Sequence, residues 1–231
     1  VFLDPNKFSE KGTTSMSGLS FNKKGTLAAY NISEGGSDWQ KIVIINAITK
    51  EKIDETITDV KFSGASWLGD EGFFYSSYGK VQGSELSVKT DMHKVYFHKL
   101  GTKQSEDKHI IGDENFKRRY MNIGVSDDER FLILNAATAT NGNELYVKDL
   151  KNNTDWIAIQ KGYDYNTDVL DTKGDFIYIM TDKNAPNMKL QKFDIKNPSV
   201  WTDVIPETEN VLSASTGGGY IFAKYMKDAV S

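Results

Sequence analysis

Short hydrophobic runs alternate with polar turns along the whole chain. Runs such as Ile42–Ile45 and Phe131–Leu134 are of strand length and rich in β-branched and aromatic residues. Runs of this kind, bounded by Gly, Asn, Asp and Lys, predict β-strands. No stretch carries the spacing of an amphipathic helix, so we predict an all-β chain.

A longer unit recurs five times: a hydrophobic strand, a polar turn and an aromatic-rich strand. The copies align on Gly25, Gly72, Glu129, Gly174 and Gly218, and they lie 47, 57, 45 and 44 residues apart. A period of roughly 40–50 residues built from short strands is typical of β-propeller blades, each a four-stranded antiparallel meander. One blade cannot bury both of its faces, so neighbouring blades must stack on it. We therefore predict that residues 1–231 form a single, partial β-propeller domain of about four and a half blades.

The pattern also gives strand positions within the first blades. We predict the four strands of blade one at residues 16–21, 26–33, 41–47 and 52–57, and the first strand of blade two at 62–67. The long 57-residue spacing comes from a polar insertion, Gly79–Met92. Loops of this length are uncommon in compact domains and are often functional, so we expect this one to be mobile.

Composition excludes several classes of protein. There are 28 Lys and Arg against 32 Asp and Glu, a net charge of −4, so no basic field attracts nucleic acid or an anionic membrane. The apolar runs are too short to cross a bilayer. Cysteine is absent, which excludes disulfides and thiol catalysis. We expect a soluble protein and leave its compartment open between cytoplasm and periplasm.

The chain lacks the common catalytic and cofactor motifs. No Gly-x-Ser-x-Gly, phosphate-binding loop, His-Glu-x-x-His or EF-hand loop occurs. The three histidines, His93, His98 and His109, do not fall at the even intervals of one strand face, so we interpret them as surface or strand-edge residues. We therefore predict no metal, no cofactor and no catalytic residue in these 231 residues.

Both ends of the chain fall within a blade. Residues 1–5 have the pattern of the last strand of an earlier blade, and the fifth copy stops after its second strand. We expect a piece of a longer protein. The strand over residues 220–227 would then be an open edge, and open edges recruit other chains, so self-association is expected.

Several segments, taken in order, are more specific than the repeat. They are Val1-Phe-Leu-Asp-Pro-Asn6, Gly36-Ser-Asp-Trp39, Val60-Lys-Phe-Ser63, Gly72-Phe-Phe-Tyr75, His98-Lys-Leu-Gly-Thr102 and Thr181-Asp-Lys-Asn-Ala-Pro186. In this order and spacing the chain resembles the β-propeller domain of the prolyl oligopeptidase family. The resemblance implies a seven-bladed propeller inserted into an α/β-hydrolase domain that carries the catalytic serine, histidine and aspartate. It implies that this chain is catalytically silent alone, gates access for short proline-containing peptides and meets the hydrolase domain.

The resemblance also implies site residues. Phe62, in the Val-Lys-Phe-Ser segment, corresponds to an aromatic that packs against bound peptide, and Tyr120 and Thr140 fall near two further substrate-binding positions. Asp38 falls on a loop that faces the hydrolase domain. A family arginine falls on Ala137, where this chain departs from the pattern. Without the resemblance, Phe62 is interpreted as a core aromatic. Trp39, beside Asp38, is interpreted as a packing residue.

A different class of function stays open. A stand-alone propeller can serve as a protein-interaction scaffold, as WD-type arrays do. The Gly-His and Trp-Asp signature of those arrays is absent here. A Gly-x-Ser-x-Gly motif in adjoining sequence would favour the peptidase.

Overall fold

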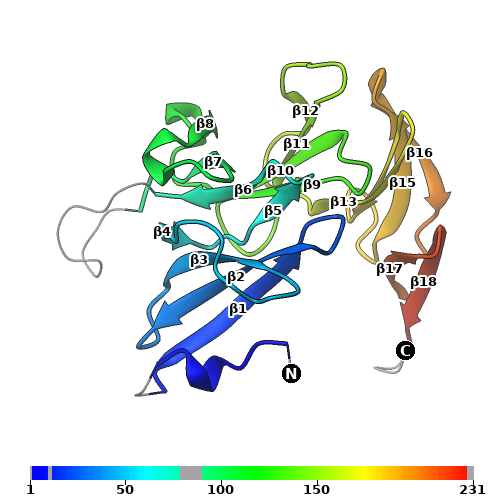
Figure 1. Ribbon diagram of the computed structural model, residues 1–231. Coiled ribbons are helices and arrows are strands. Elements are labelled where there is room, and N and C mark those ends of the chain that lie inside the picture. Colours follow the sequence, from blue (N-terminus) through cyan, green and yellow to red (C-terminus); the bar gives the residue numbers. More distant parts are fainter. Residues whose placement is uncertain (1, 10–11, 79–89, 228–231) are drawn as a thin grey trace. The chain divides into compact units, whose positions relative to one another are not determined.

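The computed structural model describes residues 2–9, 12–78 and 90–227, and more than half of them lie in strands (Figure 1). The chain divides into two compact units, residues 1–125 and 126–231, which are described one at a time. The predicted all-β class is confirmed. Three single-turn 3-10 helices interrupt the described strands: η1 (Pro5–Lys7), η2 (Gln104–Glu106) and η3 (Glu114–Phe116). No helix in this part of the chain is long and apolar enough to span a bilayer.

The first unit is built on one antiparallel sheet with the order β1-β2-β3-β4-β6-β7-β8, to which β5 adds by pairing with β6. Its strands are β1 (Thr14–Phe21), β2 (Leu27–Glu34), β3 (Trp39–Asn46), β4 (Ile57–Lys61), β5 (Ser66–Leu68), β6 (Gly72–Ser77), β7 (Lys94–Lys99) and β8 (Lys108–Ile111). The unit ends with β9 (Tyr120–Val125).

The fourth strand of blade one differs from its prediction. Residues 52–56 contribute only one bridge, between Ile45 and Lys52, and the strand itself is β4, which begins at Ile57. β4 pairs with β3 on one side and, through Val60 and Ser77, with β6 on the other. The strand therefore joins two predicted blades into one sheet. The segment that follows β4 was predicted as a strand from Phe62 on, but only its end is one, namely β5.

Four of the five turns that align the repeat are confirmed as sharp turns with positive φ. They are at Gly25, Glu129, Gly174 and Gly218. In the second copy the turn glycine is Gly69, because Gly72 already begins β6. Gly72 is required for another reason: a Cβ there would lie 2.0 Å from the His98 carbonyl oxygen on the paired strand. Its small size lets the two backbones approach.

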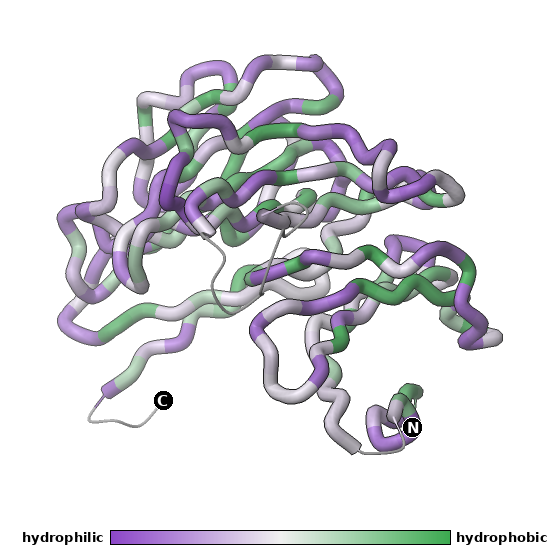
Figure 2. The backbone as a smooth tube through the Cα atoms, turned by 90° about the vertical axis from the view of Figure 1, so that its left-hand side faces the viewer, coloured by the Kyte–Doolittle hydropathy of each residue, from purple (hydrophilic) through white to green (hydrophobic). Residues whose placement is uncertain are grey.

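The core of the first unit follows the buried faces of β2, β3 and β6. Ile42, Ile44, Ile57 and Phe73 are fully buried and belong to one cluster that also includes Trp67. Every residue of β6 is buried, which explains the apolar run Phe73–Tyr75 at its centre. Figure 2 shows the corresponding alternation of hydrophobic strand segments and hydrophilic turns along the tube.

The second unit continues with sheets of the predicted kind. Within this unit the strand orders are β12-β11-β10, β13-β14-β15-β16 and β17-β18. The strands are β10 (Phe131–Ala137), β11 (Glu144–Asp149), β12 (Ile157–Gln160), β13 (Thr167–Lys173), β14 (Phe176–Thr181), β15 (Lys189–Asp194), β16 (Asn197–Ile205), β17 (Val211–Gly217) and β18 (Tyr220–Met226). The four-stranded antiparallel meander of a propeller blade is thus present.

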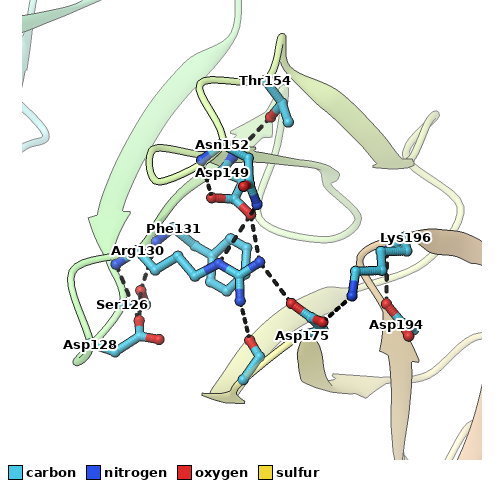
Figure 3. A network of polar contacts seen from close by, with 11 residues as sticks. Ser126, Asp128, Arg130, Phe131, Asp149, Asn152, Thr154, Asp175, Asp194 and Lys196 are labelled. Atoms are coloured by element: carbon cyan, nitrogen blue, oxygen red, sulfur yellow. Dashed lines mark hydrogen bonds and ion pairs between the residues drawn. The ribbon is translucent and has the colours of Figure 1, made fainter.

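Arg130 ties two hairpins of the second unit together (Figure 3). Its guanidinium donates to Asp149 Oδ2 through Nε and Nη2 at 3.0 and 2.7 Å, and through Nη1 to the Gly174 carbonyl oxygen at 2.8 Å. Nη2 also lies 2.8 Å from Asp175, which pairs with Lys196. The hydrogen bond to Asp149 is the main cause that keeps the pKa of Arg130 above its usual value, and the hydrogen bond to Asp175 adds to it. The guanidinium therefore bridges the β10–β11 sheet and the β13–β14 turn.

Candidate functional site

Phe62 is an exposed aromatic residue in a strained backbone conformation. It follows the last residue of β4 with φ at +54°, and 48% of its surface is exposed. A bulky residue with positive φ is a genuine outlier that costs of order 1–3 kcal/mol and persists only where neighbours hold it. Strain of this kind clusters at functional sites.

The neighbours that hold this turn are visible at Ser63. The buried Asn31 donates from Nδ2 to the Ser63 carbonyl oxygen at 2.7 Å. The Ser63 hydroxyl oxygen accepts a hydrogen bond from the Ser76 backbone N–H at 2.8 Å. The turn is therefore anchored to β2 and β6, and the Phe62 ring is directed outward rather than into the core. The interpretation of Phe62 as a core aromatic is wrong.

Tyr120 packs against Phe62. The two ring centroids are 5.3 Å apart with an interplanar angle of 84°, an edge-to-face geometry, and 45% of the surface of Tyr120 is exposed. Such pairs are worth about 0.5–1.5 kcal/mol beyond the area they bury. Two of the three predicted substrate-binding residues thus form one exposed pair.

Two further rings extend this surface. Trp39 and Tyr78 meet edge to face with centroids 6.2 Å apart. Burial is the largest cause that raises the pKa of Tyr78, to about 12, and the electrostatic interaction with the neighbouring Tyr120 adds to it. The Tyr78 hydroxyl is therefore neutral at physiological pH. We call Trp39, Phe62, Tyr78 and Tyr120 the aromatic patch. The prediction that Trp39 is a packing residue is consistent with this contact.

Lys61 supplies a cation to the aromatic patch. Its ammonium lies 5.1 Å from the Phe62 ring centroid and 5.2 Å from that of Trp39, within cation–π range. It is also 3.6 Å from Asp38 Oδ2. The Lys61 side chain is 15% exposed and that of Asp38 is 71% exposed, so the carboxylate stands outermost. Asp38 is thus part of the same neighbourhood as Phe62.

His93 lies beneath the patch and is almost completely buried, with 1% of its surface exposed. Its ring stacks on Tyr78 with centroids 4.5 Å apart and 20° between the planes. Nε2 is 2.9 Å from the Lys61 carbonyl oxygen, and Nδ1 accepts from the Met121 backbone N–H at 2.9 Å. Burial lowers the pKa of His93 to about 4, although the hydrogen bond to Lys61 opposes the shift. The imidazole is neutral at physiological pH.

His98 is buried in a different part of the first unit. Its Nδ1 lies 2.8 Å from Asp107 Oδ1, and its Nε2 faces Asp54 Oδ2 at 3.5 Å. The Tyr75 hydroxyl donates to the other Asp107 oxygen at 2.8 Å. Within the described residues Nε2 makes no hydrogen bond and faces no nucleophile, so this histidine–aspartate pair is not arranged for nucleophilic catalysis.

The interpretation of the histidines as surface or strand-edge residues is therefore wrong for His93 and His98. It fits His109, which is exposed. The bonding partners lie far away in sequence, as with Met121 for His93, and spacing alone carries no signal for them. Among the described residues no group of three potential metal-ligating side chains occurs.

Thr140 and Ala137 belong to the second unit. Thr140 lies in the exposed turn between β10 and β11, and Ala137 is the last residue of β10. Residues 79–89 of the predicted mobile insertion lie outside the described part of the chain.

Neither of two cavities in the first unit is lined by Phe62 or Tyr120. A cavity of about 530 Å³ is lined by Tyr75, Tyr96, Gln104 and seven other residues. Its polar groups are already paired, since Gln104 Nε2 donates to the Thr58 carbonyl oxygen at 2.9 Å. A smaller cavity of about 280 Å³ opens beside Trp39. A cavity thus borders the aromatic patch at Trp39.

Repeated antiparallel sheets with propeller spacing define the class of this chain as part of a β-propeller. The family described as "Prolyl oligopeptidase, N-terminal beta-propeller domain" matches residues 1–231, and the chain belongs to that family. The resemblance noted from sequence is confirmed.

Individual relatives agree with this placement. A prolyl endopeptidase from Elizabethkingia meningoseptica is 65% identical over 100% of this chain and 33% of its own length. Prolyl oligopeptidase A from Galerina marginata is 30% identical over 100% of this chain and 35% of its own length. The chain therefore spans about a third of the curated relatives it matches.

Solved structures show the same fold. One from a structural and mechanistic study of two prolyl endopeptidases superposes with a TM-score of 0.87 at 27% identity, covering 99% of this chain and 33% of that one. Prolyl oligopeptidase B from Galerina marginata, bound to a 35mer hydrolysis and macrocyclization substrate, has a TM-score of 0.89 at 24% identity over 98% of this chain and 34% of its own. The latter similarity concerns the fold alone.

Proposed function

We propose that this chain is the propeller part of a prolyl-specific serine endopeptidase, where it gates access of short proline-containing peptides and lines part of their binding pocket. The observation that supports the proposal is the strained and exposed Phe62 packed on Tyr120. Surrounding hydrogen bonds hold an unfavourable backbone so that an apolar ring faces outward. Such an arrangement costs stability and gains nothing for the core.

The patch suits the proposed substrate. Proline-containing segments favour the extended polyproline II conformation, and aromatic-lined surfaces bind them. The rings of Phe62 and Tyr120 offer a face and an edge to such a segment. Thr140 belongs to the proposal as a third substrate-binding residue. Asp38, outermost beside Lys61, is the residue proposed to face the hydrolase domain.

The proposal assigns no chemistry to the chain itself. The sequence contains no Gly-x-Ser-x-Gly motif, so the acylating serine would come from the part of the protein outside these residues. Purified residues 1–231 should therefore not cleave proline-containing peptides. Turnover that copurifies with the pure chain and survives serine-peptidase inhibitors would contradict this assignment.

The binding role is tested in the full-length protein with Phe62→Ala. Its matched control is Phe176→Ala. Phe176 is 42% exposed and has the Lys192 ammonium 5.0 Å from its ring centroid, but it lies outside the patch. We expect Phe62→Ala to raise KM about tenfold for peptides with several residues before the proline, and less for the shortest substrates. Equal effects of the two substitutions at every peptide length would refute the binding role.

A stand-alone interaction scaffold remains the second candidate. The observation that favours it is the apolar surface of the last hairpin, where Tyr220, Phe222 and Met226 are 73%, 58% and 55% exposed. Activity of the full-length protein on proline peptides separates the two functions, because a scaffold has none.

A further inference from the structure

We infer that His93 is a positioning residue that sets the geometry of the Phe62–Tyr120 pair, and hence the selectivity of the patch for the peptide segment it contacts. The inference deepens the proposed function and rests on it. His93 itself is buried and touches no surface that a peptide could reach.

The imidazole of His93 joins two backbone groups. One is the carbonyl of Lys61, the residue immediately before Phe62, and the other is the N–H of Met121, immediately after Tyr120. One ring thus bonds the backbone next to both members of the aromatic pair. Phe62 and Tyr120 are the two members of the aromatic patch with more than 40% of their surface exposed.

The two partners fix the protonation of the ring. A backbone N–H can only donate and a carbonyl can only accept. Nδ1 must therefore be unprotonated toward Met121, and Nε2 must carry the hydrogen toward Lys61. In the other tautomer, and in an imidazolium, Nδ1 would carry a hydrogen that points at the Met121 N–H, so two donors would face each other. The contact therefore selects one neutral form of the side chain.

The ring is held in place on its remaining faces. It stacks on Tyr78, whose own edge contacts Trp39. The backbone that carries it is closely approached by Gly112, where a Cβ would lie 2.7 Å from the His93 carbonyl oxygen. Gly112 also has a φ of +115°, so both the close approach and the backbone conformation require glycine there. Little room is left for the imidazole to move, as a residue that positions others requires.

The test uses the full-length protein and three variants. His93→Phe keeps a flat ring beside Tyr78 but removes both hydrogen bonds. His93→Gln keeps an N–H donor and an oxygen acceptor, which can replace the donor and the acceptor of the neutral imidazole. His98→Gln is the matched control, a buried histidine bonded to Asp107 that lies outside the patch.

We expect His93→Phe to raise KM for longer peptides about tenfold, more than for the shortest ones, with little change in kcat. His93→Gln should restore most of the loss, and His98→Gln should not change the ratio between long and short peptides. A uniform effect of His93→Phe on all lengths would overturn the inference. If Phe62→Ala alters the length dependence and His93→Phe does not, the inference fails while the proposed function stands. If neither does, the proposed function has failed.

A second measurement does not depend on activity. Long-range ¹H–¹⁵N correlation spectra report which imidazole nitrogen carries the hydrogen, and comparison with His93→Gln assigns the signal. The geometry requires protonated Nε2 and bare Nδ1 at neutral pH. A signal for the Nδ1-protonated tautomer or for an imidazolium would refute the positioning contact.

Discussion

His98 Nδ1 lies 2.8 Å from Asp107 Oδ1, and both side chains are buried in the first unit. Burial alone lowers the pKa of His98, but the hydrogen bond and charge of Asp107, with the charge of Asp54, outweigh it and raise the pKa. A base whose pKa is raised by folding stabilises the fold below its unfolded pKa of about 6.5. That contribution is lost as the pH rises through the folded value.

We therefore predict that His98→Gln loses more stability relative to the parent protein at about pH 5 than at about pH 9. Urea unfolding of both proteins across this range measures the difference. The difference in free energy of unfolding between the two proteins does not contain the titration of His93, because both proteins have this residue. A gap that stays constant with pH would contradict the prediction, because it would show that folding leaves the pKa of His98 unchanged.

His93 should behave in the opposite sense. Its folded pKa of about 4 lies below the ordinary value, so the folded state binds fewer protons than the unfolded state between these values. Stability is fully present above about pH 6.5 and falls as the pH drops to 4, by about 3 kcal/mol in all. The titratable neighbours are Tyr78, stacked on the ring, and Lys61, whose carbonyl it meets. His93→Gln should lack this part of the acid sensitivity in the same unfolding series.

Arg130→Met should destabilise the second unit by about 3 kcal/mol, because it leaves the buried Asp149 carboxylate without its charged partner. Arg130→Lys should recover only part of the loss, since an ammonium cannot reproduce the two-nitrogen contact. The control is Lys196→Met, which removes an exposed partner of Asp175 and should change stability little. Similar unfolding midpoints for Arg130→Met and Lys196→Met would show that the bridge contributes nothing.

Residues 1–231 should self-associate through the β17–β18 hairpin. That hairpin forms a two-stranded sheet with Tyr220 and Phe222 exposed, and such a surface recruits other chains. Sedimentation analysis should detect dimers or larger species, and Phe222→Lys should shift them toward monomer. A monomer at high concentration in both proteins would refute the expectation.

The sequence predicted the fold class and most turn positions, because strand period and turn residues act locally. Gly25, Gly174 and Gly218 adopt positive φ where the repeat places turns. The course of β4 was missed, because pairing with both β3 and β6 depends on partners distant in sequence. The positive φ of Phe62 could not be predicted from the sequence, because phenylalanine rarely adopts this conformation. The same holds for His93, whose two backbone partners lie on β4 and β9, far from it in sequence.

The most direct test of the account is a double-substitution cycle in the full-length protein with Phe62→Ala, Tyr120→Ala and both together. The rate constant kcat/KM is measured for a short and a longer proline peptide. Because the rings form one edge-to-face pair, we expect the two losses on the longer peptide to be coupled by about 1 kcal/mol, with the double variant losing less than the sum. If the ratio of long to short peptide is unchanged in all three variants, the aromatic patch does not bind substrate.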